Sequence, residues 1–150
     1  MSNAASNYLE ERVLDFFLKN NAQSTSSPST VFVGLFNTDD SSGATDELLE
    51  AGTLTHECQG GGYQRKAVTF GTISGGSVSN SGAITFPTAT DGNWGTITHV
   101  AILDAEAQAK DNDSAGAGNV LFYGALTTAK TIESGDTFEI QASNLTVTLT

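Results

Sequence analysis

Two apolar runs in the second half of the chain constrain its fold most strongly. They read GTITHVAILDA, at residues 95–105, and NVLFYGALT, at residues 119–127. Short apolar runs bounded by Asp, Gly and Asn are typical of strands in the middle of a packed sheet. β-Branched residues such as Val100 and Ile102 favour a strand over a buried helix, which the spacing of apolar residues alone leaves open. The stretch Gly95–Thr127 therefore predicts a central pair of strands, joined by an acidic loop that contains glycine.

Further strand-like segments flank this pair. Residues 30–38, TVFVGLFNT, are apolar on both faces, which predicts a central strand. Gly34 within them predicts a bulge or the close approach of another backbone. Residues 144–150 alternate between apolar residues and threonine, as expected of a half-buried strand. The remaining strand-like segments are residues 65–71, 74–80, 82–87 and 136–142. The chain is thus predicted to be mainly β: about eight strands in an antiparallel β-sandwich or a partly closed barrel, forming a single domain over residues 1–150.

Residues 7–20 form the one convincing helical segment. Four apolar side chains share one face of this predicted amphipathic helix: Leu9, Val13, Phe16 and Phe17. Asn7 is placed to cap the helix, with Glu10 as its capping-box partner. Such a face either packs on the chain's own sheet or also serves a neighbouring subunit, and the sequence leaves both interpretations open. We treat residues 1–21 as an N-terminal helical arm and the four apolar residues as interface candidates.

Residues 39–62 are the longest irregular segment, and they form an acidic loop that ends in three glycines. Connections in compact domains are usually about 4–6 residues long, so a longer one is typically functional, disordered or an interface arm. Within it, residues 46–51, DELLEA, favour one helical turn. Cys58 is the only cysteine, so no disulfide can form within the chain. We interpret it as an unreactive thiol in a polar loop.

The charge and hydropathy of the chain exclude several classes of partner. The net charge is −11, from 17 acidic and 6 basic residues, which argues against binding to nucleic-acid phosphates or to anionic membranes. No apolar run approaches the length of a transmembrane helix. The N-terminus lacks the basic and apolar regions of a secretory signal. We therefore expect neither nucleic acid nor a membrane among the partners.

The residues that could do chemistry do not assemble into a catalytic or zinc-binding pattern. His56, Cys58 and His99 fall short of a four-ligand zinc site, and His99 is better interpreted as a half-buried residue of the central strand. The sequence has no G-x-S-x-G elbow, no evident Ser-His-Asp arrangement and no phosphate-binding loop. We therefore predict no catalytic residue, no metal site and no cofactor.

The loop between the two central strands is rich in carboxylates, which are ligands that calcium prefers. Residues 111–116, DNDSAG, begin like an EF-hand loop, but position twelve is Phe122 where that loop requires a bidentate acid. A looser calcium site remains as one interpretation, and a solvated hairpin loop is the other. The calcium candidates are Asp104, Glu106, Asp111 and Asp113.

Two aromatic residues complete the set of interface candidates. Tyr63 and Trp94 both lie beside glycines at predicted strand starts. If exposed, they would suit a carbohydrate or a protein partner. The alternative is that they anchor the edge of the core, since aromatic residues dominate burial.

The order of the segments adds a resemblance. The succession SNYLEERVLDFFL, TVFVGLFNTD, GGGYQRKAVTFG, SNSGAITFPTAT, WGTITHVAILDA, NVLFYGALTTAKTI and SGDTFEIQASNLTVTLT resembles a family of small bacteriophage virion proteins, tail-fibre-like or tail proteins. It covers residues 6–150. The departure is Asp46–Gln59, which is longer and more acidic than the family's link into GGGY.

The resemblance implies a non-enzymatic structural protein of the virion, assembled in the cytoplasm of the bacterial host. We expect it on the particle exterior, associated with the tail or a fibre, because its acidic surface would be repelled by packaged DNA. A capsid decoration (cement) protein is the first alternative, and a host-surface glycan-binding module is the second. The expected partners are other virion proteins and further copies of the chain, in a homo-oligomer such as a trimer.

Overall fold

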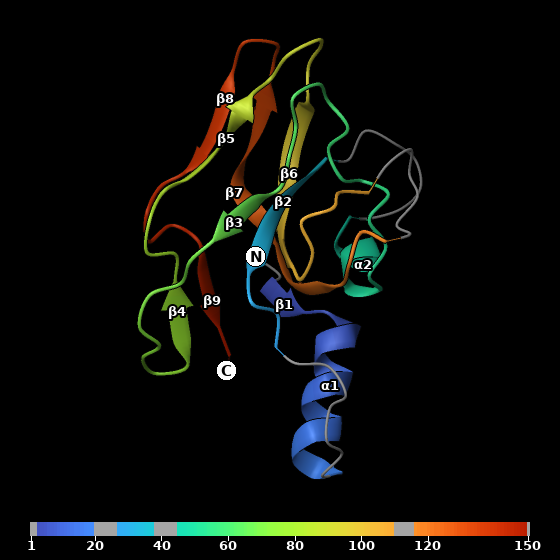
Figure 1. Cartoon of the computed structure of the whole chain (residues 1–150), viewed down its shortest axis with the longest axis vertical. Helices are drawn as coiled ribbons and strands as arrows, with labels where there is room; N and C mark the ends of the chain where they lie inside the picture. The colour runs from blue at the N-terminus through green and yellow to red at the C-terminus, as the bar shows by residue number, and fades with distance from the viewer. Residues whose placement is uncertain (1–2, 20–26, 38–44, 110–115, 150) are drawn as a thin grey trace.

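The computed structural model describes residues 3–19, 27–37, 45–109 and 116–149, and it shows a mainly β chain with antiparallel sheets (Figure 1). The two helices are α1 (Asn7–Leu18) and α2 (Thr45–Glu50). The strands are β1 (Asn3–Ala5), β2 (Val31–Asn37), β3 (Lys66–Val68), β4 (Ser77–Ser79), β5 (Ile84–Thr88), β6 (Gly95–Leu103), β7 (Val120–Ile132), β8 (Thr137–Ile140) and β9 (Thr146–Thr148). The predicted fold class and N-terminal helix are confirmed.

The largest sheet has five strands in the order β1-β7-β6-β2-β3, and every neighbouring pair is antiparallel. The predicted central pair, β6 and β7, is confirmed, and β2 is central as its apolar composition predicted. Two further pairs, β5–β8 and β4–β9, form separate two-stranded sheets. The described strands thus form layered sheets and not a closed barrel.

Apolar side chains pack on both faces of the five-stranded sheet. One core lies between this sheet and the β5–β8 pair, and it contains Val33, Leu35, Ile97, Phe86 and Phe138. The other core lies on the opposite face and includes α2; it contains Phe36, Leu49, Leu54, Leu103 and Val120. Burial on both faces explains why β2 and β6 read as continuous apolar runs in the sequence.

The pairing of β6 with β7 is interrupted by a shift of register. Ile97 pairs with Lys130 and His99 pairs with Ala125, so residues 126–129 of β7 lie opposite Thr98 alone. Extra residues bend the strand that carries them. Residues 126–128 of this segment line the groove described below.

The structure corrects the prediction for Gly34. The register is regular there, with Gly34 opposite Ala101, so there is no bulge at this residue. The close approach is real, but it comes from side chains. A Cβ atom at Gly34 would lie 3.1 Å from Leu103 Cδ1 and 3.2 Å from Glu57 Oε1. The glycine therefore leaves room for a buried carboxylate.

The described residues of the acidic loop, 45–62, pack against the rest of the protein. α2 confirms the predicted helical turn, and Leu49 and Leu54 are fully buried. Cys58 lies in a loop, as predicted, but it is fully buried in an apolar core, so the prediction of polar surroundings was wrong. Its backbone N–H bonds to Leu35 O of β2 at 2.9 Å, which draws this segment onto the sheet. Residues 39–44 of the loop lie outside the described residues.

Candidate functional site: a projecting helix and an apolar groove

The most polar cluster in the interior is centred on Glu57, whose side chain is fully buried. Arg65 Nε donates to Glu57 Oε1 at 2.6 Å, and Arg65 Nη2 donates to Oε2 at 2.7 Å. Tyr63 Oη donates to Oε1 at 3.1 Å, and the backbone N–H of Ala109 donates to Oε2 at 2.8 Å. The carboxylate is therefore saturated with donors, which suits a structural group and leaves it no role as a catalytic base.

The buried Arg65 side chain extends this cluster to two further segments. Its Nη1 donates to Ala105 O at 2.8 Å and to Ala117 O at 2.7 Å. Both carbonyls belong to the connection between β6 and β7. A single ion pair thus fastens the GGGYQR segment and both described ends of that connection, in a chain that has no disulfide.

The aromatic candidates Tyr63 and Trp94 lie in the core, where they are 4% and 2% exposed. Their ring centroids are 5.5 Å apart in an edge-to-face arrangement, and Trp94 Nε1 donates to Gly61 O at 2.9 Å. Burial raises the pKa of Tyr63 well above its usual value, and the neighbouring carboxylate of Glu57 adds to this effect. Tyr63 therefore stays protonated and donates its hydrogen bond. Their burial disfavours both residues as contacts for a glycan or a protein partner.

The glycines beside these aromatics explain the packing. A Cβ atom at Gly60 would lie 2.1 Å from Trp94 Cδ1, and one at Gly61 would lie 2.1 Å from Thr90 O. The run of three glycines is therefore needed for close approach to Trp94 and the segment before it.

The two histidines have separate structural partners. His99 Nε2 lies 3.2 Å from Asp46 Oδ1, and its Nδ1 lies 2.8 Å from Thr98 Oγ1. His56 is buried, with Nδ1 2.8 Å from Thr45 Oγ1. His99 is half-buried in the central strand, as the sequence predicted. Within the described ranges, no three His, Cys, Asp or Glu residues are grouped so that they could hold a metal ion.

The described calcium candidates have other surroundings. Asp104 accepts two hydrogen bonds from Asn119: the backbone N–H bonds to Oδ1 at 2.6 Å, and Nδ2 bonds to Oδ2 at 2.9 Å. This side chain closes the base of the connection between β6 and β7. Glu106 is exposed. Asp111 and Asp113 lie outside the described residues, so the calcium hypothesis stays a prediction.

The base of α1 is fixed firmly to the sheet. β1 pairs with β7, with Ala5 opposite Phe122. The next residue, Ser6, is fully buried; its N–H donates to Leu121 O at 3.0 Å, and its hydroxyl bonds to Val120 O. Ser6 is also the N-cap, because its Oγ accepts from Leu9 N at 3.4 Å. The prediction that Asn7 caps the helix was wrong by one residue.

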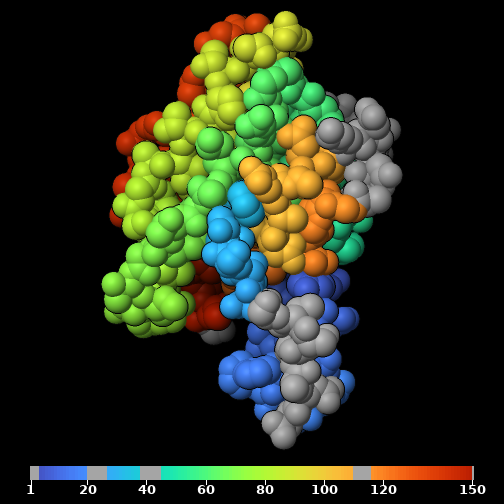
Figure 2. All heavy atoms as spheres, in the orientation of Figure 1, coloured from blue at the N-terminus to red at the C-terminus, as the bar shows by residue number. Residues whose placement is uncertain are grey.

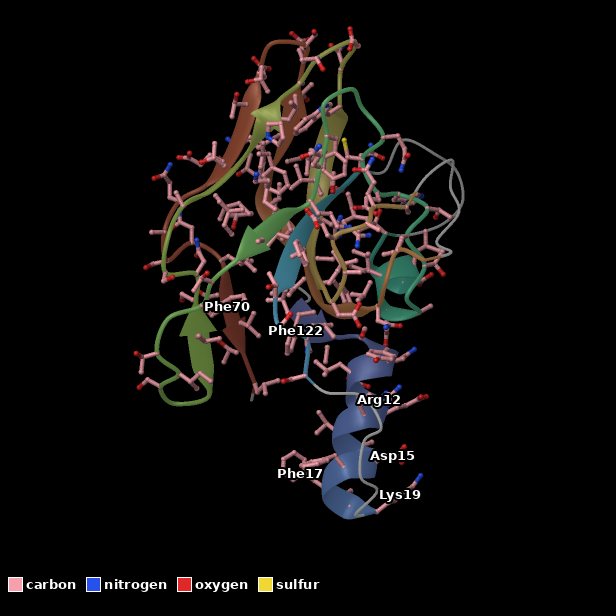
Figure 3. The ribbon with its side chains drawn as sticks, viewed as in Figure 1. Arg12, Asp15, Phe17, Lys19, Phe70 and Phe122 are labelled. Carbon is pink, nitrogen blue, oxygen red and sulfur yellow. The ribbon has the colours of Figure 1, made fainter. Side chains whose placement is uncertain are left out.

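Beyond this base, α1 projects from the body of the protein (Figures 1 and 2). None of its residues is buried. Phe16 is 52% exposed and Phe17 is 73% exposed, with their rings edge to face at 5.0 Å. Figure 3 shows Phe17 on the side of the helix opposite Arg12 and Lys19. Beyond Leu9, the apolar face of α1 therefore does not pack on the chain's own sheet, which was one of the two interpretations left open by the sequence.

An apolar groove lies between β7 and the C-terminal strands, with a volume of about 410 Å³. We call it the C-terminal groove. Its apolar lining is mostly half-buried and includes Phe122, Leu126, Ile140, Leu145, Val147 and Leu149. Ala4 and Ala5 of β1 lie at its edge, so the groove adjoins the strand that leads into α1. The structure thus places two apolar surfaces next to the same short strand.

Lys130 and Glu139 are the only charged residues that line this groove among those described. Their formal charges cancel, although the whole chain carries −11. Nothing in this lining resembles a set of catalytic groups. The groove is suited to apolar contact with another protein segment.

Comparisons with known proteins agree with a structural role. No helix in the described parts of the chain is long and apolar enough to cross a membrane. A search of curated proteins found no match. Residues 4–148 match a family described as podophage GP4 fiber I protein gp80. Because this match spans nearly the whole chain and a fibre protein is a structural component of the virion, we conclude that the chain belongs to the Gp80 family of phage fibre proteins.

Proposed function

We propose that the chain is a non-enzymatic component of the phage particle, located on its exterior and attached to the tail or to a fibre. The observation that carries this proposal is the match of residues 4–148 to a phage fibre family, and the exposed apolar face of α1 supports attachment to a partner. A helix that buries none of its residues in its own chain gains little from tertiary packing, and short isolated helices are marginal in water. A partner that covers this face would stabilise it.

The rest of the surface supports an assembly role. The buried polar groups at Glu57 and Arg65 are committed to one another, and the aromatic residues that could have bound a glycan are in the core. The negative charge of the chain favours a place away from packaged DNA. The paired buried charges, the buried aromatic residues and the negative net charge are all consistent with attachment through apolar contacts.

The experiment is to locate the protein in intact particles. Purified virions of the phage that encodes this chain are imaged by electron cryomicroscopy after labelling with an antibody raised against the folded protein. We expect label at the tail or its fibres. Label over the head lattice would refute the tail placement and identify a capsid decoration protein. Absence of the protein from purified virions would refute a virion role altogether.

A further inference from the structure

Helix α1 cannot pack into the C-terminal groove of its own chain. The pairing of β1 with β7 and the two hydrogen bonds of Ser6 fix where α1 begins and the direction in which it leaves the sheet. With this anchoring, Phe17 remains 73% exposed, and Leu149 at the groove remains 66% exposed. Each chain therefore carries an unfilled apolar groove and an apolar helix face on which Val13, Phe16 and Phe17 are exposed and Leu9 is half-buried.

The two surfaces have matching form. A helix that binds in a groove presents apolar anchors at positions i, i+3 or i+4, and i+7, and Leu9, Val13 and Phe16 follow this spacing. The volume of the groove, about 410 Å³, is large enough to accept bulky side chains. The 12 residues of α1 span about 18 Å, so the helix projects far enough to reach another molecule.

Charge favours a second copy of this chain as the occupant. Two chains with a net charge of −11 repel each other over most of their surfaces. The groove is an exception, since its lining holds one cation, Lys130, and one anion, Glu139. On α1, Phe17 lies on the side opposite Arg12 and Lys19 (Figure 3). The groove is therefore a surface that a second acidic copy can approach with little repulsion.

The contact must bury more than the two exposed aromatic rings of the helix. An aromatic side chain carries about 150–250 Å² of surface, so the exposed parts of Phe16 and Phe17 together offer roughly 250 Å². A stable interface buries about 800 Å² on each partner. The two rings thus supply about a third of that area, so the rest of the helix face and the residues around the groove must supply the remainder.

From these observations we infer that the chain assembles head to tail with copies of itself, with the helix face of one copy seated in the C-terminal groove of the next. The inference rests on the proposed function for its setting, because a particle component is present in several copies. The contact is heterologous, so it closes into a ring if the rotation between copies allows it. The partner of α1 is thus a second copy of this chain.

The test uses single charge substitutions on each surface of the full chain. Phe17→Glu places a carboxylate on the helix face, and Leu149→Glu places one at the groove; both residues are exposed in the single chain, so neither change should prevent folding. Analytical ultracentrifugation should show an oligomer for the wild type. We expect either substitution to weaken self-association by about 100-fold or more, because an unpaired carboxylate would be buried. Phe16→Glu provides a second test of the helix face.

Mixing the two variants distinguishes this contact from others. The Phe17→Glu chain keeps an intact groove, and the Leu149→Glu chain keeps an intact helix face. An equal mixture should therefore form a 1:1 heterodimer that grows no further. Ile73→Glu is the matched control: Ile73 is 74% exposed and lies outside both surfaces, so this variant should assemble like the wild type. Circular dichroism of each variant checks that it is folded.

Three results would overturn the inference. They are a wild-type chain that stays monomeric at its highest soluble concentration, a Leu149→Glu chain that assembles like the wild type, and a mixture that forms no heterodimer. A monomeric chain that is nevertheless found in virions would remove only the copy-to-copy contact. A ring-forming chain that is absent from virions would instead remove the proposed function.

Discussion

Removal of the positive charge at Arg65 is the sharpest test of what holds this fold together. In the variant Arg65→Met, the carboxylate of Glu57 stays fully buried but loses both of its charged donors. Breaking a buried ion pair from one side costs about 3–5 kcal/mol, because an unpaired charge remains in the interior. The carbonyls of Ala105 and Ala117 also lose their donor, at about 1–3 kcal/mol for each one that stays buried and unpaired.

These terms set the expected size of the effect. We predict that Arg65→Met lowers the free energy of unfolding by at least about 3 kcal/mol. Since domains are typically stable by about 5–15 kcal/mol, the variant should be marginally stable. The double variant Glu57→Gln/Arg65→Met removes both charges and keeps an oxygen that can accept from Ala109 N. It should therefore be more stable than Arg65→Met alone.

Urea unfolding followed by fluorescence of the single tryptophan measures both quantities, provided that the slope of the transition is the same in all variants. Lys66→Met is the control, because it makes the same change in net charge one residue away, on a half-buried side chain. The control should differ from the wild type by less than about 1 kcal/mol. A loss below about 1 kcal/mol for Arg65→Met, or a double variant less stable than Arg65→Met, would contradict our account of the ion pair.

Three further predictions concern the core. Because burial raises the pKa of Tyr63, the native state keeps the phenol proton at pH values where the unfolded chain releases it. Above about pH 10, this group should therefore lower the free energy of unfolding by up to about 1.4 kcal/mol per pH unit. In urea denaturation at pH values from about 9 to 11, Tyr63→Phe should show a shallower fall than the wild type. Ile102→Ala should cost about 2–5 kcal/mol in urea unfolding, since this buried residue lies in the central strand, and a near-neutral result would contradict its central position. Gly61→Ala should clearly lower the melting temperature, because the new Cβ atom would lie 2.1 Å from Thr90 O. Gly82→Ala should leave the melting temperature nearly unchanged, because no atom lies within 4 Å of its Cβ position. Equal melting temperatures for the two variants would refute the packing of Gly61 against Thr90.

The sequence was sufficient to predict the strands that carry a strong apolar signal. β2, β6 and β7 are buried on both faces or lie in the middle of the large sheet, so their composition is dictated by the core. It was not sufficient for β1. Asn3, Ala4 and Ala5 have no strand propensity of their own, and they are extended because they pair with β7. A pairing over more than a hundred residues leaves no local signal.

Local sequence was also insufficient to predict which of the polar and aromatic residues are buried. Glu57 and Arg65 lie in polar stretches of the sequence, where charged residues close to glycines are usually exposed to solvent. Only the folded chain brings the two side chains together in the interior. Tyr63 and Trp94 were candidates for exposure for the same reason, although the adjacent run of three glycines is a signal for close packing that could have indicated burial. For α1, the spacing of apolar residues identified the face but not what covers it, because a core and a partner require the same pattern.

The three-residue strand β1 has a consequence for the position of the N-terminal helix. With only three residue pairs, its register against β7 is weakly fixed by the strand itself, and a slip of one residue would turn its side chains to the opposite face and move the start of α1 by about 3.3 Å. The hydroxyl and N–H of Ser6, which bond to consecutive carbonyls of β7, oppose that slip. One buried serine thus fixes the point at which α1 begins, and with it how far the helix extends from the sheet.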